Sequence, residues 1–347
     1  MPQVTAYACD DETTHFHPLT ITVREPGPTE VLFDVKYAGI CHSDIHTARS
    51  EWRQATYPLV PGHEIAGIVT KIGSQVTKFA VGDKIGVGCM VDSCRVCGYC
   101  KDGTEQFCDG PGGTLWTYGP DRNGAPTAGG YAKAFTVDQD FGLHIPEAID
   151  FSAAAPLMCA GITTYSPLHH WGAGPGKKVA IVGLGGLGHV AVQIAAAMGA
   201  EVSVISRTLA KQDDGLRLGA SHYYAMSEPG TASALRGSFD LILTTVSGST
   251  DLDPIIGMLT VGGVLVDVGL PEHASTLHMS GLTHGARILA GSLIGGIAET
   301  QEMLDFCADH DIAPIVEVIG GEDITAAYDK VVASKVRYRY VIDTSTF

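Results

Sequence analysis

Alternating apolar and polar positions dominate the first part of the chain. The alternation runs over residues 19–23 and again over 31–37, on either side of a Pro-Gly-Pro turn at 26–28. A period of two indicates strands with one buried face, so the two segments predict an antiparallel hairpin. Strand patterns return at 65–69 and 131–137. These segments predict a β-rich first domain.

The pattern changes in the middle of the chain. Val179–Val182 is a continuous apolar run, which is typical of a buried strand. In the segment from His189 to Met198, apolar residues recur every four positions, which predicts a helix with one buried face. Gly199 ends that helix, and Glu201–Ile205 predicts a second strand. A strand, a helix and a strand in this order indicate a parallel α/β sheet.

The alternation of predicted strands and helices continues toward the C-terminus. We expect strands at 239–244, 263–270 and 337–343, and helices at 252–259, 299–310 and 322–334. The sequence therefore predicts the α/β class, with a β-rich domain joined to a doubly wound parallel sheet.

The turn between the first strand and helix of the α/β unit is rich in glycine. It contains Gly183, Gly185, Gly186, Leu187 and Gly188. Glycine lets backbone N–H groups approach a pyrophosphate, and the helix N-terminus that follows favours negative charge. Glycines also mark ordinary turns, but this motif lies between a strand and a helix, with a second strand at the right distance. It predicts a dinucleotide site.

The end of the second strand indicates which dinucleotide binds. NAD sites usually carry an acidic residue there for the ribose hydroxyls. This chain instead has Ser206 and Arg207, with Lys211 one turn later. A hydroxyl and two cations suit a 2′-phosphate, so the sequence predicts NADP. The alternative is that Arg207 and Lys211 form a solvated surface.

Composition narrows the class of protein. A chain of 347 residues is long enough for two domains, and its net charge of −16 argues against nucleic acid or an anionic membrane as a partner. No secretory signal or membrane-spanning segment is evident, which predicts a cytoplasmic protein. Nine cysteines in such a chain point to metal more than to disulfides.

Four of these cysteines lie in one short segment, in a lobe of about residues 89–110. Their positions are Cys94, Cys97, Cys100 and Cys108. Four thiolates at this spacing can surround a tetrahedral zinc and leave no open position, which predicts a structural site. Disulfides are the alternative. A DNA-binding zinc finger is disfavoured because the chain is acidic and no basic helix flanks the lobe.

Two weaker clusters precede this lobe. The first is Cys41–His46, which contains a thiol, a hydroxyl, a carboxylate and two imidazoles, and the second is His63-Glu64. Taken alone, Cys41 is more often a small buried apolar residue, and a histidine beside a strand is usually structural.

These motifs together resemble those of the zinc-dependent medium-chain dehydrogenase/reductase superfamily and its cinnamyl alcohol dehydrogenase-like branch. The resemblance covers essentially the whole chain. The motifs are GICHSD at 39–44, PGHE at 61–64, the four-cysteine lobe, CAGITTY at 159–165, GLGGLG at 183–188 and RYV at 339–341. The resemblance implies a GroES-like catalytic domain formed by residues 1–150 and 291–347, and a Rossmann NADP-binding domain formed by 151–290.

The resemblance also assigns a catalytic zinc site. Cys41, His63 and Cys159 match its ligands, and Glu64 matches an alternative fourth ligand. Asp44 matches the carboxylate that orients the histidine ligand. With the four-cysteine lobe, two zinc ions per chain are implied.

The resemblance also assigns residues to proton transfer and to cofactor binding. Ser43 and His46 match a proton relay from the substrate oxygen to the surface. Thr163 matches a residue beside the nicotinamide, and Arg339 matches one near the pyrophosphate. His42 stands where NAD-dependent relatives often have a pyrophosphate-binding arginine, although the cinnamyl branch commonly has histidine there.

The expected activity is reversible hydride transfer between NADP(H) and primary alcohols or aldehydes, with aromatic and medium aliphatic substrates. Trp52, Met90 and Trp116 are candidates for an apolar substrate pocket or for plain packing. The alternatives are a polyol or secondary-alcohol dehydrogenase, a zinc-free quinone reductase-like enzyme, and a non-catalytic NADP-binding protein. By likeness we expect a homodimer, with residues 290–298 as an edge strand or, alternatively, an internal one.

Overall fold

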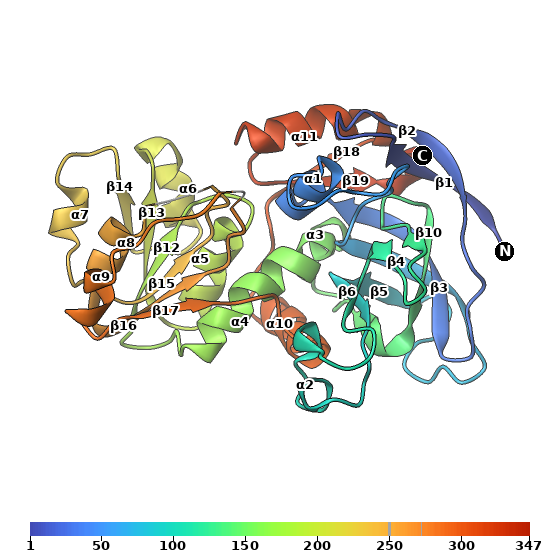
Figure 1. Cartoon of the computed structure of the whole chain (residues 1–347), viewed down its shortest axis with the longest axis horizontal. Coiled ribbons are helices and arrows are strands. Elements are labelled where there is room, and N and C mark those ends of the chain that lie inside the picture. The colour runs from blue at the N-terminus through green and yellow to red at the C-terminus, as the bar shows by residue number, and fades with distance from the viewer. Residues whose placement is uncertain (249–250, 272) are drawn as a thin grey trace. The chain divides into compact units, whose positions relative to one another are not determined.

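The computed structural model describes residues 1–248, 251–271 and 273–347, and the chain divides into two units (Figure 1). Unit 1 comprises residues 1–162 and 295–347, and unit 2 comprises residues 163–294. The boundaries thus differ from the expected 150/151 and 290/291. The first one moves because helix α3 (Phe151–Pro156) packs against the sheet of unit 1.

Unit 1 is built on a seven-stranded sheet. Its strand order is β11 (Leu143–His144), β5 (Lys84–Val87), β4 (Ile65–Ile72), β3 (Glu30–Gly39), β19 (Arg339–Asp343) and β18 (Val316–Ile319), and β10 (Ala134–Asp138) also pairs with β3. Neighbouring strands are antiparallel except β18 and β19. The last strand of the chain therefore lies beside β3, one of the earliest.

The expected hairpin between residues 19–23 and 31–37 is wrong. Strand β2 (Phe16–Thr22) pairs with β1 (Gln3–Cys9) over its full length, and these two form a separate sheet. The backbone of β3 is already paired with β4, β10 and β19. The connection also contains two prolines, which lack the N–H that a ladder needs.

Unit 2 is a parallel six-stranded sheet with the order expected of a Rossmann domain. Its strands are β14 (His222–Ala225), β13 (Glu201–Ser206), β12 (Lys178–Val182), β15 (Phe239–Thr244), β16 (Leu259–Asp267) and β17 (Ile288–Gly291), in that spatial order. The strand order reverses direction between β12 and β15, and such switch points are where ligands bind in open α/β sheets. The α/β fold class is confirmed.

Helices and short strands complete the two units. In unit 1 these are α1 (His42–Ala48), α2 (Gly98–Lys101), the π-helical turn η3 (Leu157–Gly161), α10 (Ile297–Asp309), α11 (Ile324–Val332), β6 (Met90–Asp92), β7 (Leu115–Trp116), β8 (Gly119–Pro120) and β9 (Pro126–Thr127). In unit 2 they are α5 (Gly188–Ala197), α6 (Gln212–Arg217), α7 (Thr231–Ala234), α8 (Asp253–Gly257) and α9 (Ser280–Thr283). Helix α4 (Ile162–His170) begins at the boundary.

The expected strand at 290–298 is mostly wrong. β17 ends at Gly291, and α10 begins at Ile297 with Gly296 as its N-cap. A side chain at Gly296 would meet the backbone oxygen of Gly103 at 1.8 Å, so this residue serves a close backbone approach and does not continue a ladder. β17 is nevertheless the edge strand of its sheet.

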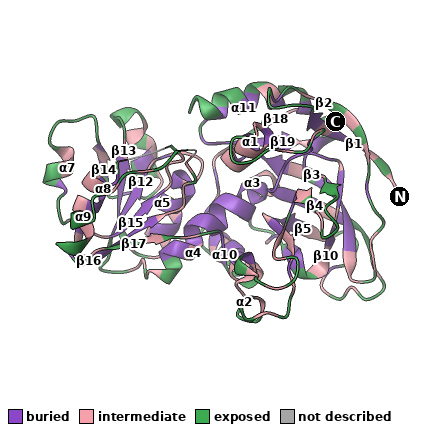
Figure 2. Cartoon of the chain, in the orientation of Figure 1, coloured by how far each residue is buried: buried purple, intermediate pink, exposed green. Residues whose placement is uncertain are grey.

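Each unit has its own core, and burial follows the sheets (Figure 2). In unit 1, the fully buried Tyr131 and Tyr328 lie in a cluster with residues of β1, β3, α1 and α11. In unit 2, residues of β12, β15 and β16 pack with α8. Each unit can therefore hold its own site residues rigidly.

The glycine-rich turn gives a test of this packing. A Cβ at Gly188 would lie 1.9 Å from the carbonyl oxygen of Gly183, whereas one at Gly185 would meet nothing within 4 Å. We expect Gly188→Ala to lower the free energy of unfolding by about 1–3 kcal/mol, measured by urea denaturation. Gly185→Ala is the matched control and should unfold like the wild type. Equal urea denaturation midpoints for the two variants would contradict the close packing of Gly188 against the carbonyl of Gly183.

Candidate active site and metal centres

Four buried side chains from three separate segments meet in unit 1. Cys41 precedes α1, His63 and Glu64 precede β4, and Cys159 lies in the turn η3. Their ligand atoms all lie within 4.8 Å of one another. The sheet explains this convergence, because the N–H of Gly39 donates to the carbonyl of Glu64 (2.8 Å) where β3 ends and β4 begins. π-Helical turns such as η3 are frequent at functional sites.

The carboxylate of Asp44 holds this cluster in place through hydrogen bonds. It is fully buried and accepts hydrogen bonds from the N–H of Cys41 (3.2 Å), the N–H of Gly62 (3.1 Å), Nδ1 of His63 (2.8 Å) and the hydroxyl of Tyr118 (2.8 Å). A carboxylate only accepts, so His63 carries its proton on Nδ1. Nε2 of His63 is therefore the nitrogen available as a ligand.

Glu64 has a partner that sequence reasoning did not find. Arg339, from β19, donates to both carboxylate oxygens of Glu64. Both side chains are buried. A side chain at Gly39 would collide with this carboxylate at 2.0 Å. The structure thus places Arg339 in an ion pair with Glu64. Its expected contact with the pyrophosphate stays a prediction.

The electrostatics of the cluster follow from burial and close pairing. A hydrogen bond with Cys159 lowers the pKa of Cys41 well below its usual value, and the same bond raises the pKa of Cys159. Burial raises the pKa of Glu64 to about 8, although Arg339 opposes this shift. Closely spaced sulfur, nitrogen and oxygen donors in a buried site are suited to a cation.

The donor set fits a catalytic zinc ion. Two sulfurs and one imidazole nitrogen are ligands that zinc prefers. Because Arg339 already engages Glu64, the three donors Cys41, His63 and Cys159 leave a fourth position for substrate or water.

Helix α1 carries the remaining expected catalytic residues. His46 donates from Nδ1 to the carboxylate of Glu51, and its ring stacks on Trp52 with centroids 4.8 Å apart. Its Nε2 is buried without a hydrogen-bond partner among the described residues. Ser43 and His42 lie on the same helix, and burial lowers the pKa of His42. The unpaired Nε2 is the atom that a proton relay needs.

The four-cysteine lobe forms a second, separate cluster. Sγ–Sγ distances are 3.4 Å for Cys97–Cys100, 3.9 Å for Cys94–Cys100 and 4.0 Å for Cys97–Cys108. A tetrahedral zinc with Zn–S bonds of about 2.3 Å separates its sulfurs by about 3.8 Å. The N–H of Cys94 also points at Sγ of Cys108 (3.3 Å). No disulfide joins any of the nine cysteines, all of which the structure describes.

Unit 2 presents the dinucleotide motif as expected. Gly183 has a φ of +93°, which only glycine adopts readily, and a Cβ at Gly185 would meet no atom within 4 Å. Ser206 ends β13, and the exposed Arg207 follows it. Lys211 donates to the carbonyl of Leu184 (2.8 Å), so its ammonium supports the glycine-rich turn.

Other predicted cofactor residues are also placed in unit 2. Gly186 and Leu187 lie in the turn that leads into α5, and Gly188 is the first residue of that helix. Thr163 is buried near the start of α4.

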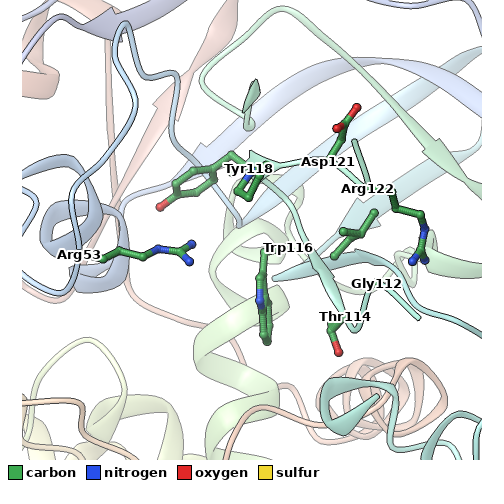
Figure 3. Close-up of a pocket in the computed structure, with 10 residues that line it drawn as sticks. Arg53, Gly112, Thr114, Trp116, Tyr118, Asp121 and Arg122 are labelled. Carbon is green, nitrogen blue, oxygen red and sulfur yellow. The ribbon is translucent and has the colours of Figure 1, made fainter. Parts of the chain in front are cut away.

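The three predicted pocket residues have different surroundings. Trp116 lines a cavity in unit 1, whereas Met90 is buried beside it on the paired strand β6 (Figure 3). Trp52 is 39% exposed and stacks on His46. Sequence reasoning did not identify Tyr118 as the partner of Asp44, and it overlooked Arg53, which lines the same cavity.

Comparison with known proteins agrees with this site. Residues 27–147 match the family model of the alcohol dehydrogenase GroES-like domain, and residues 186–309 match that of zinc-binding dehydrogenases. None of the described helices is long and apolar enough to cross a membrane.

Relatives are similar over nearly the whole chain. The "NADP-dependent alcohol dehydrogenase C 1" of Mycolicibacterium smegmatis is 58% identical over all of this chain and 99% of its own length. The "Aldehyde reductase YahK" of Escherichia coli is 47% identical over 95% of both chains.

Solved structures show the same fold. A cinnamyl alcohol dehydrogenase from Sorghum bicolor superposes with a TM-score of 0.95 and 38% identity, covering 99% of this chain and 98% of its own. One from Helicobacter pylori, complexed with NADP(H), has a TM-score of 0.93 and 43% identity with the same coverage. With both metal-ligand clusters and the Rossmann unit in place, the chain belongs to the zinc-binding alcohol dehydrogenases, a family of oxidoreductases that includes the cinnamyl alcohol dehydrogenases.

Proposed function

We propose that this protein interconverts primary alcohols and aldehydes with NADP(H), and that it holds one catalytic and one structural zinc ion per chain. The observation that carries the proposal is the buried Cys41–His63–Cys159 cluster, whose histidine is oriented by Asp44. The Sγ–Sγ distances in the four-cysteine lobe support the second metal.

The balanced reaction is aldehyde, NADPH and a proton giving alcohol and NADP⁺. When bound, zinc acts as a Lewis acid on the carbonyl oxygen, and NADPH supplies the hydride. Asp44 keeps His63 in the tautomer that presents Nε2, and Arg339 pairs with the carboxylate of Glu64 beside the cluster.

The proton for the product alkoxide comes from the chain. We assign it to Oγ of Ser43. Nε2 of His46 takes up a proton from solvent and passes it on to restore the Ser43 hydroxyl. Glu51 engages Nδ1 of His46 and so fixes the ring, which leaves Nε2 for proton transfer.

Arg207 supports the choice of NADP over NAD. It follows directly after β13, and no acidic residue stands at this position. Lys211 contributes positive charge nearby, although its ammonium is bound to the carbonyl of Leu184. The relatives named above include NADP-dependent enzymes.

We also propose a cytoplasmic homodimer. β17 is an edge strand, and its Ile288 and Leu289 are 42% and 39% exposed, which suits pairing with a second copy. Nine unpaired thiols favour a reducing compartment.

Initial rates with cinnamaldehyde or benzaldehyde, measured with NADPH and with NADH, test the proposal. We expect turnover with NADPH and much slower turnover with NADH. Arg207→Gln should lower kcat/KM for NADPH roughly tenfold through the lost phosphate contact, with little change for NADH. Arg217→Gln, an exposed arginine on α6, is the control and should behave like the wild type.

Several outcomes would change the proposal. Equal rates with NADPH and NADH would exclude the cofactor preference and leave the chemistry intact. Turnover of polyols or secondary alcohols alone would shift the substrate class, and cofactor binding without any turnover would indicate a non-catalytic protein.

The zinc content of cysteine variants distinguishes the two proposed zinc sites. We expect two zinc ions per wild-type chain by elemental analysis. Cys159→Ser should retain one ion, keep its circular dichroism spectrum and lose activity. Cys108→Ser should also retain one ion, but its melting temperature should fall because a closed four-sulfur site contributes to folding. Full activity of Cys159→Ser, or two ions in either variant, would contradict these assignments.

A further inference from the structure

A cavity of about 300 Å³ opens within unit 1 (Figure 3). One wall is the segment from Gly112 to Arg122, and the other is the loop after α1 that carries Arg53. The size is at the lower end of what small-molecule sites usually have. An aromatic ring of Trp116 faces this space and offers a flat apolar surface.

The charged groups around the cavity differ in whether they are already engaged. Asp121 accepts hydrogen bonds from the backbone of Asn123 (2.8 Å) and Ala125 (2.9 Å). Arg122 is held by the carboxylate of Asp92 and by the carbonyls of Pro111 and Ser93, and it lies at the far side of the cavity. The side chains of Asp121 and Arg122 therefore already form hydrogen bonds with neighbouring residues of the protein.

Arg53 is different. Among the residues that the structure describes, none forms a hydrogen bond or ion pair with its side chain. Its guanidinium reaches toward Trp116 and Tyr118, and Nη2 lies 3.9 Å from where a Cβ on Gly119 would stand. Arg53 is exposed to solvent, so its guanidinium is a positive charge at the edge of the cavity that is free to bind a ligand.

The cavity adjoins the metal-ligand cluster through Tyr118. Tyr118 lines it, and the centre of its ring lies 6.4 Å from that of His63. Trp52, the neighbour of Arg53, stacks on His46. A molecule in the cavity would thus contact Tyr118, whose ring neighbours the metal-ligand candidate His63.

We propose that Arg53 is a specificity-determining residue that binds a carboxylate at the far end of the aldehyde or alcohol substrate, while Trp116 packs against the carbon skeleton between the two ends. This inference rests on the proposed function, because it names a substrate class for that same site. Guanidinium and carboxylate match in geometry and charge, and an aromatic wall favours a flat skeleton.

The test compares two aldehydes of similar shape, 4-carboxybenzaldehyde and 4-methylbenzaldehyde, with NADPH. The wild type should show the higher kcat/KM with the carboxylate. Arg53→Gln should lower kcat/KM for 4-carboxybenzaldehyde about fivefold, as expected for an ion pair with an exposed arginine, and leave 4-methylbenzaldehyde within about twofold. Arg53→Lys should restore part of the loss.

Controls separate a local contact from a general change in charge. Arg49→Gln removes a cation four residues earlier, one that is paired with Asp329, and should not change the ratio of the two substrates. Raising the salt concentration should reduce the preference for the carboxylate in the wild type and not in Arg53→Gln. The KM for NADPH should be the same in both.

Binding of 4-(hydroxymethyl)benzoate, measured by calorimetry, gives a readout that does not need turnover, and Arg53→Gln should weaken it about fivefold. An unchanged substrate ratio and unchanged binding in Arg53→Gln would overturn the inference. A raised KM for NADPH would overturn it in favour of a cofactor-phosphate contact. Failure of the wild type to reduce 4-methylbenzaldehyde would instead count against the proposed function.

Discussion

The buried carboxylate of Asp44 is the group on which the catalytic cluster depends. Removing a charge from water is costly unless donors replace the lost hydration. Here four donors do so, and they come from the start of α1, from the segment before β4, and from the loop after the four-cysteine lobe. The same hydrogen bonds that compensate the buried charge also set the positions of Cys41 and His63. Stability and ligand geometry therefore have a common origin.

Glu64 and Arg339 form the second buried charged pair, and it depends on the sheet. β19 lies beside β3, and β3 pairs with β4, which brings a residue of the C-terminal strand against one that precedes β4. The absence of a side chain at Gly39 leaves room for the Glu64 carboxylate. A buried pair of this kind is costly to break, because each partner alone would be an uncompensated charge.

Local motifs made the dinucleotide-binding turn and the four-cysteine lobe predictable from the sequence. The glycine-rich turn and the four cysteines each lie in a short segment, so spacing alone defines their geometry. Contacts between distant residues were not accessible in this way. Glu64 and Arg339 are 275 positions apart, and Tyr118 and Asp44 are 74 apart. The pairing of β2 with β1 was missed for a related reason, since alternation shows which face is buried but not which strand lies alongside.

Unit 1 is built from two separate stretches of the chain, residues 1–162 and 295–347. This affects the order in which the protein assembles during synthesis. All four cysteines of the lobe leave the ribosome early and within a few residues of one another, so this cluster can close locally. The other cluster must wait for Cys159, and the buried Glu64 has no counter-charge until β19 is made at the end of the chain. Between these events unit 2 is translated in full and can fold by itself. The whole of unit 2 is thus synthesised before unit 1 is complete.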